Sequence, residues 1–306
     1  MEQKKILVIC GPTATGKTAL AIALAKRFGG ELVGADSRHL YKGLDILTGK
    51  DIPEETKIWM VDLVDMTKSF SVFQYVRLAQ RVIRDIWRRE KLPIVVGGTG
   101  LYIQALVSGL PLIHIPPNPI LRNKLNGLSV SELQDALKEE NSSKLFTMNV
   151  SDLNNPRRLI RAIEIARSLT KGGRKIPQIW QTPEALWIGL RASVGELEKW
   201  ITRRVYSRWE MAVEEVRKLS KQGVSGHLPA VTSLGVRAVQ SYLKGTATRE
   251  GAQRQWVLAE RGYAKRQITW FKKQKHIRWF DVTKRGFEKD VSDEVRIWYT
   301  GTHDEN

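Results

Sequence analysis

The sequence predicts an α/β protein with a parallel sheet at its core, a helical domain inserted into that core, and a helical C-terminal region. Three observations predict this fold. An apolar, strand-like stretch at residues 6–10 leads through a glycine-rich turn into a helix pattern. Further short apolar runs then alternate with amphipathic helix patterns over the first third of the chain. At a cluster of prolines after residue 110 the composition becomes polar and helical.

The glycine-rich turn follows the pattern G-x-x-x-x-G-K-[ST], the signature of a phosphate-binding loop. Its residues are Gly11, Pro12, Thr13, Ala14, Thr15, Gly16, Lys17 and Thr18. In such a loop, backbone N–H groups and a helix N-terminus attract an anion, the lysine reaches the outer phosphates, and the hydroxyl binds Mg²⁺. The helix that the motif requires is predicted at residues 19–28. The sequence therefore predicts a P-loop-type sheet with a diphosphate or polyphosphate site, in which Thr18 is the protein's ligand to Mg²⁺.

A second strand is predicted at residues 31–35, and Asp36, Ser37, Arg38 and His39 follow its carboxyl end. In an open parallel sheet the carboxyl ends of the strands face the ligand crevice. Asp36 is therefore expected beside the phosphate-binding loop. A carboxylate at that place can bind Mg²⁺, accept a proton or cap the next helix, and the pattern leaves these roles open.

A second glycine-rich strand end is predicted at the same crevice. After a third strand at residues 58–64 and a helix at residues 70–90, the apolar run at residues 93–96 has the composition of a buried strand. It opens into the glycine-rich residues 97–102. No acidic residue follows this strand, where ATPases with the same loop hold Mg²⁺, and this weighs against ATP hydrolysis.

Prolines at positions 111, 116, 117 and 119 mark a domain boundary. We expect a core at residues 1–116 and 183–306, and an inserted helical domain at residues 117–182. Arg122 follows the prolines closely, so it is expected to reach back over the crevice.

Within the insert, a helix is predicted to begin at Pro156, with Arg157, Arg158 and Arg161 on its first turns. Between residues 155 and 175, seven lysines and arginines stand against one glutamate. An exposed basic helix end is the simple interpretation. The density of charge favours contacts with the backbone phosphates of a nucleic acid.

The C-terminal part returns to the sheet and is otherwise helical. A strand is predicted at residues 186–190, helices at 194–222, 234–243 and 249–275, and an edge strand at 277–281. From residue 261 to residue 278 there are seven lysines and arginines and no acidic residue, so this face can bind phosphates. The aromatic side chains Tyr263, Trp270 and Phe271 are predicted to anchor the helix in the core rather than to stack on bases.

The charge of the 306-residue chain is strongly positive, with 50 lysines and arginines against 32 acidic residues, and it is uneven. Residues 1–115 carry 16 against 11, whereas residues 116–306 carry 34 against 21. Such a field suits a polyanion such as nucleic acid. A single cysteine, Cys10, excludes a disulfide within the chain and a cysteine-based zinc site. Without a membrane span or a signal-peptide pattern, the protein is expected to be cytoplasmic.

Five sequence blocks, present together and in order, closely resemble those of the tRNA dimethylallyltransferases. They are residues 11–18, Asp36-Ser37, residues 97–102, residues 155–162 and residues 264–271. The resemblance extends from the first strand to about Phe280. It implies transfer of a dimethylallyl group from dimethylallyl diphosphate to N6 of the adenosine at position 37 of tRNA, next to the anticodon.

The resemblance also implies roles for individual residues. Asp36 matches the general base, and Thr99 and Arg122 match catalytic contacts at the tRNA and the diphosphate. The residues implied to hold the tRNA anticodon stem-loop are Asp36, Ser37, Arg38, His39, Thr99, Arg122, Arg157, Arg158, Leu159, Ile160 and Arg161. The chain departs from the family at His39, where glutamine is usual, and over residues 45–51. Mg²⁺ is the expected cofactor and a monomer the expected state.

Three alternatives stay open beside this resemblance. A related enzyme prenylates free adenine nucleotides, but the basic insert and C-terminal helices argue against it. The loop alone is also compatible with a small-molecule kinase that uses ATP. The third alternative is an RNA-binding protein whose glycine-rich loop is only structural.

Overall fold

The computed structural model describes residues 3–110, 112–113, 115–170, 183–221 and 234–301, and the chain divides into two compact units. The larger unit comprises residues 1–109 and 182–306, and the smaller unit comprises residues 110–181. The division therefore falls a few residues before the predicted boundary at residue 117. The last part of the predicted insert, residues 171–182, lies outside the described residues.

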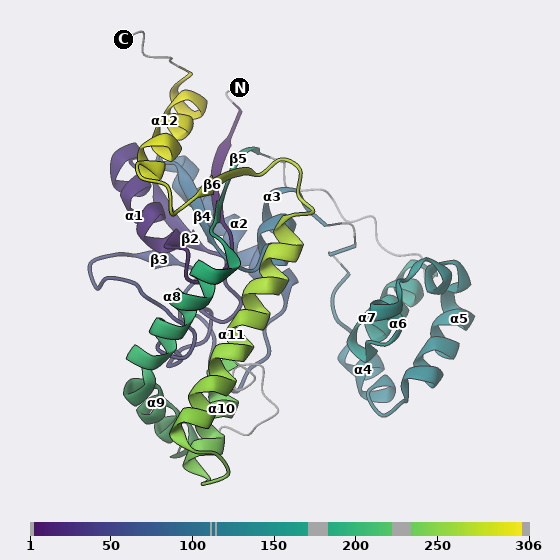
Figure 1. The fold of residues 1–306 in the computed structure, drawn as a ribbon. Coiled ribbons are helices and arrows are strands. Elements are labelled where there is room, and N and C mark those ends of the chain that lie inside the picture. Colours follow the sequence, from purple (N-terminus) through teal and green to yellow (C-terminus); the bar gives the residue numbers. More distant parts are fainter. Residues whose placement is uncertain (1–2, 111, 114, 171–182, 222–233, 302–306) are drawn as a thin grey trace. The chain divides into compact units, whose positions relative to one another are not determined.

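The larger unit is built on a parallel sheet, as the sequence predicts (Figure 1). In the part of the chain that the structure describes, its six strands have the order β3-β2-β4-β1-β5-β6. The strands are β1 (Lys5–Cys10), β2 (Glu31–Gly34), β3 (Ile58–Trp59), β4 (Pro93–Gly97), β5 (Glu184–Arg191) and β6 (Arg278–Asp281). Strand β1 pairs with β4 on one side and with β5 on the other. Its residues Ile6 to Cys10 are fully buried, which explains their unbroken apolar character.

Helices of the larger unit cover the sheet and extend beyond it (Figure 1). They are α1 (Lys17–Phe28), α2 (Val72–Arg88), α3 (Gly100–Val107), α8 (Val194–Ser207), α9 (Trp209–Lys221), α10 (Leu234–Leu243), α11 (Arg249–Phe271) and α12 (Phe287–Thr300). A hydrophobic core joins α1 and α12 to strands β1, β4 and β5 through buried aliphatic side chains. The members of this core alternate along each strand, so it lies on one face of the sheet, and helices α2 and α3 also contact the strands.

Some elements differ from the sequence prediction. The predicted third strand is only two residues long, because Met60 and Asp62 adopt positive φ angles and turn the chain away from the sheet. The helix predicted at residues 194–222 is divided at Arg208, and the next residue, Trp209, is buried. Helices α3 and α12 were not predicted. Phe271 is fully buried, so the prediction that it anchors its helix in the core is confirmed.

The smaller unit is helical and has its own core. Its helices are α4 (Pro119–Leu125), α5 (Val130–Thr147), α6 (Val150–Leu153) and α7 (Pro156–Thr170). Asn118, Ser129 and Asn149 cap the first three of these helices with their side-chain oxygens. Helix α7 begins at Pro156, as the sequence predicts. Its buried face packs with leucines of α4 and α5.

Candidate functional site

The first residue of the glycine-rich loop after β1 has a backbone conformation and surroundings that suit only glycine. Gly11 has a φ of +136°, and a Cβ there would lie 2.4 Å from the carbonyl oxygen of Leu190. Gly16 adopts a left-handed conformation with φ of +75° and forms the N-cap of α1. The glycines of the motif thus bring the loop against β5 and aim the N-terminus of α1 at the space above it.

Lys17 lies at the centre of this loop with its amino group turned inward. Its Nζ donates a hydrogen bond of 2.6 Å to the carbonyl oxygen of Pro12, and Thr15 Oγ1 donates one of 2.9 Å to the same oxygen. Burial lowers the pKa of Lys17 to about 8, although the charge of Asp36 acts in the opposite direction. A negative charge bound in the loop would therefore stabilise the protonated form of Lys17.

Asp36 and Thr99 lie at the ends of neighbouring strands, β2 and β4, and hydrogen bonds hold these ends together. Asp36 Oδ1 accepts a hydrogen bond of 2.9 Å from the backbone N–H of Arg38, in a local turn. Thr99 Oγ1 accepts one of 3.0 Å from the backbone N–H of Ser37. The sequence expectation that Asp36 lies beside the phosphate loop agrees with this placement, since its charge acts on Lys17.

A cavity of about 340 Å³ opens between the loop and the two strand ends, entirely within the larger unit. Among the predicted site residues, those that line it are Thr13, Ala14, Gly16, Lys17, Thr18, Asp36, Arg38 and His39. The rest of the wall includes residues from α1, from the segment 47–53, from β2, β3 and β4 with Val61, and from helices α8, α10 and α11. The structure thus brings the phosphate loop and the Asp36 segment together around one cavity.

Helices α8 and α11 contribute polar residues to the cavity that the sequence analysis did not assign. Arg204 Nη2 donates a hydrogen bond of 2.8 Å to Thr13 Oγ1 and pairs with Glu260 at 3.0 Å. Burial raises the pKa of Glu260. The side-chain amide of Gln267 contacts both Thr13 and Gly98. Glu260, Tyr263 and Gln267 all line the cavity from α11. They follow one another at intervals of three and four residues, and this spacing is the sequence signal that places them on one face of the helix.

Five further predicted residues, Gly11, Pro12, Thr15, Ser37 and Thr99, belong to the larger unit but are not among the residues that line the cavity. Arg122 and the predicted residues 157–161 lie in the smaller unit. Both oxygens of the buried Glu164 carboxylate accept hydrogen bonds from Arg122, at 2.7 and 2.8 Å. Arg161 donates to the carbonyl oxygen of Ile115 at 2.8 Å, and Arg158 pairs with Asp152.

Leu159 and Ile160 also lie in the smaller unit, where they are buried in its core. Arg157 and Arg158 are exposed on the first turn of α7. Their guanidinium groups are therefore the most accessible charges of this predicted segment.

Oxygen ligands that suit Mg²⁺ are present in the cavity. The Thr18 hydroxyl and the Asp36 carboxylate both line it, and hard oxygen donors are the ligands that Mg²⁺ prefers. The described part of the chain contains no group of three histidine, cysteine or acidic side chains that could hold a metal ion. No described helix is both long enough and apolar enough to cross a membrane.

The parallel sheet, the glycine-rich loop after β1 and the cavity at the strand ends define a nucleotide- or diphosphate-binding α/β protein of the P-loop type. A family described as IPP transferase matches residues 39–274. The chain belongs to this family, and it is a transferase of the tRNA dimethylallyltransferase type. The resemblance drawn from the sequence blocks is thereby confirmed.

Individual relatives agree with this assignment. A tRNA dimethylallyltransferase of Thermomicrobium roseum is 38% identical, over 96% of this chain and 91% of its own. The crystal structure of a tRNA isopentenylpyrophosphate transferase of Bacillus halodurans is 32% identical, with a TM-score of 0.70 over 98% of this chain and 96% of that one. A eukaryotic dimethylallyltransferase that acts on tRNA shares the fold, with a TM-score of 0.82 at 22% identity over 99% of this chain and 81% of its own.

Proposed function

We propose that the protein transfers the dimethylallyl group of dimethylallyl diphosphate to N6 of adenosine 37 in tRNA and releases diphosphate. The observation that carries this proposal is the single cavity lined by both the phosphate loop and Asp36. One side of the cavity is suited to a leaving diphosphate, and the other offers a carboxylate to an attacking amine. The family and the names of its members support the same reaction.

The loop is suited to the charge that develops on the leaving group. Breaking the allylic C–O bond leaves both bonding electrons on the diphosphate oxygen. The N-terminus of α1, the Lys17 ammonium and the Arg204 guanidinium would stabilise this charge. Thr18 would hold Mg²⁺, which neutralises charge on the diphosphate when it is bound.

Asp36 is suited to the role of general base. The N6 lone pair of adenine is delocalised into the ring, so the amine is a poor nucleophile until its proton can leave. As the new C–N bond forms, the Asp36 carboxylate would accept the N6 proton. One oxygen of Asp36 is engaged by the backbone of Arg38, which orients the side chain toward the cavity.

The apolar part of the cavity favours a prenyl group over a second polar substrate. Ile58, Val61 and Val96 line it next to Gly34, whose missing side chain leaves room. A Cβ at Gly34 would come within 3.2 Å of Val61 and 3.6 Å of Ile58. Burial of a branched five-carbon chain against such surfaces contributes a favourable free energy of roughly 0.8 kcal/mol for each buried CH₂ group.

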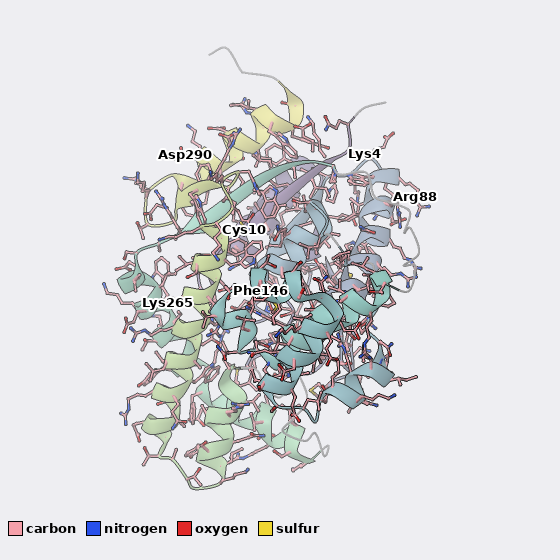
Figure 2. All side chains as sticks on the ribbon, turned by 90° about the vertical axis from the view of Figure 1, so that its right-hand side faces the viewer. Lys4, Cys10, Arg88, Phe146, Lys265 and Asp290 are labelled. Carbon is pink, nitrogen blue, oxygen red and sulfur yellow. The ribbon has the colours of Figure 1, made fainter. Side chains whose placement is uncertain are left out.

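Basic surfaces on both units support tRNA as the acceptor. Arg157 and Arg158 are exposed on α7, and Lys265 and Arg266 are exposed on α11. Figure 2 labels Lys265 on this helix. Contacts of such residues with backbone phosphates would offset the cost of extracting the target base from its stack. The monomeric state and the cytoplasmic location expected from the sequence are part of this proposal.

A comparison of wild-type protein with Asp36→Asn tests the proposal. The variant keeps an oxygen that can accept from the Arg38 N–H, so the local turn is expected to survive. Transfer of labelled dimethylallyl groups to tRNA should fall by roughly 10²- to 10⁴-fold. Binding of tRNA and of the donor at neutral pH should stay within a few-fold of the wild type.

Other outcomes would contradict the proposal. Transfer to tRNA that survives in Asp36→Asn would exclude Asp36 as the base. Efficient prenylation of AMP without tRNA would favour the free-nucleotide enzyme instead. Turnover of γ-labelled ATP with a small acceptor would favour the kinase hypothesis.

A further inference from the structure

One side chain of α11 connects the two loops on which the proposed reaction depends. Gln267 Oε1 accepts a hydrogen bond of 2.8 Å from the backbone N–H of Thr13. Its Nε2 donates one of 3.0 Å to the carbonyl oxygen of Gly98. A primary amide carries an acceptor and a donor on the same rigid group, so it satisfies both partners, whereas a carboxylate cannot donate and a hydrocarbon can do neither.

The two partners of Gln267 belong to opposite sides of the cavity. Thr13 lies in the loop proposed to hold the leaving diphosphate. Gly98 directly precedes Thr99, whose hydroxyl accepts a hydrogen bond from the N–H of Ser37, the residue next to Asp36. A hydrogen-bonded path therefore runs from the phosphate loop through Gln267 to the segment that carries the proposed base.

The surroundings are shaped around this amide. A Cβ at Gly98 would lie 2.0 Å from Gln267 Nε2 and 3.6 Å from Asp36 Oδ2. A methyl group at Gly98, directly after β4, would therefore have to displace the amide of Gln267. Gln267 is only 5% exposed, and the fully buried Phe271 fixes its helix one turn further on. The helix in turn packs Trp270 directly over Gly100 at the start of α3.

We propose that Gln267 is a positioning residue, which fixes the phosphate loop relative to Asp36 and thereby sets the rate of the transfer step. This proposal rests on the proposed function. The separation between the leaving group and the base must be held closely, since a displacement of about 1 Å can reduce the rate by on the order of 10²-fold. The affinity for the donor is expected to depend chiefly on Lys17 and on the N-terminus of α1, whereas the side-chain hydrogen bonds of Gln267 go to Thr13 and Gly98.

The first test separates rate from affinity. Gln267→Met keeps the length of the side chain but removes both hydrogen bonds. With saturating donor and tRNA, the single-turnover rate should fall by roughly 10²-fold, while the donor Kd changes less than about threefold. Gln267→Glu should be similarly slow, because its carboxylate cannot donate to Gly98. The matched control is Gln253→Met, which removes another buried amide from α11 that does not line the cavity.

The second test uses the close approach of Gly98 to the amide. Gly98→Ala should slow transfer and lower the Tm, because the new methyl group collides with Gln267. In a Gln267→Ala background the same change should cause little further loss in either quantity, since the colliding amide is absent. Such non-additivity would not arise from two independent structural defects.

The possible results distinguish this proposal from the function on which it rests. If wild-type protein does not transfer dimethylallyl groups to tRNA, the proposed function fails and the role of Gln267 fails with it. If the wild type is active and Gln267→Met lowers only the Tm, the positioning role is wrong and the function stands. A rise in donor Kd equal to the loss in rate would likewise overturn it, as would fully additive effects of Gly98→Ala and Gln267→Ala.

Discussion

Donor binding is expected to weaken above pH 8, because the lysine of the phosphate loop loses its charge there. Burial lowers the pKa of Lys17 from the ordinary 10.5 to about 8. One pH unit above the pKa, about a tenth of the amino groups stay protonated. If the ammonium form is the one that binds, the affinity for dimethylallyl diphosphate falls about tenfold for each further pH unit. An exposed lysine would produce no such change until about pH 10.

Two substitutions identify the group responsible. The negative charge of Asp36 raises the pKa of Lys17, so Asp36→Asn should move the decline to lower pH. Lys17→Arg keeps a positive charge throughout the range and should flatten the profile. Calorimetric titration of the donor without tRNA, at constant Mg²⁺ from about pH 7 to about pH 10, measures all three proteins. The donor's last phosphate pKa, near 6, does not interfere in this range. A wild-type affinity that stays constant beyond pH 9, or the same decline in Lys17→Arg, would refute the reasoning.

Three further predictions concern stability. Gly100→Ala places a Cβ 2.1 Å from the Trp270 ring, so it should cost on the order of 2 kcal/mol and lower the Tm in thermal unfolding. Glu164→Ala removes a buried carboxylate that accepts hydrogen bonds from two arginines, and chemical unfolding should show a loss of roughly 2 kcal/mol. The pKa of Glu31 is lowered to about 2, chiefly by the hydrogen bond from Arg89. The ionised Glu31 carboxylate therefore stabilises the fold above about pH 4.5, and this stabilisation is lost as the pH falls toward 2. The Tm difference between wild type and Glu31→Gln should vanish near pH 2.

The phosphate loop and the sheet around it were predictable because their determinants are local. The left-handed or otherwise restricted backbone of Gly11 and Gly16 selects glycine at those positions, whatever lies elsewhere in the chain. The burial of β1 and β4 on both faces selects continuous apolar runs. Helix α12 also carries a local signal, since Phe287, Val291 and Val295 recur every four residues. This spacing is typical of a helix, although no helix was predicted there.

The remaining wall of the cavity was not predictable, because it depends on contacts between distant segments. Gln267 meets Thr13 across 254 residues of sequence, and Arg204 meets the same threonine across 191. No spacing rule links such positions. Arg122, which is predicted to reach over the crevice, pairs with Glu164 within the smaller unit. How Arg122 acts on the tRNA or the diphosphate stays a prediction.

The proposal that Asp36 and the phosphate loop act on one donor and one adenine is tested most directly by the product. The wild-type protein is incubated with dimethylallyl diphosphate, Mg²⁺ and total tRNA, and the digested tRNA is analysed for modified nucleosides. We predict N6-dimethylallyladenosine in the tRNA, confined to position 37, with one diphosphate released for each group transferred. Unmodified adenosine, or a prenyl group at another atom or position, would contradict the account.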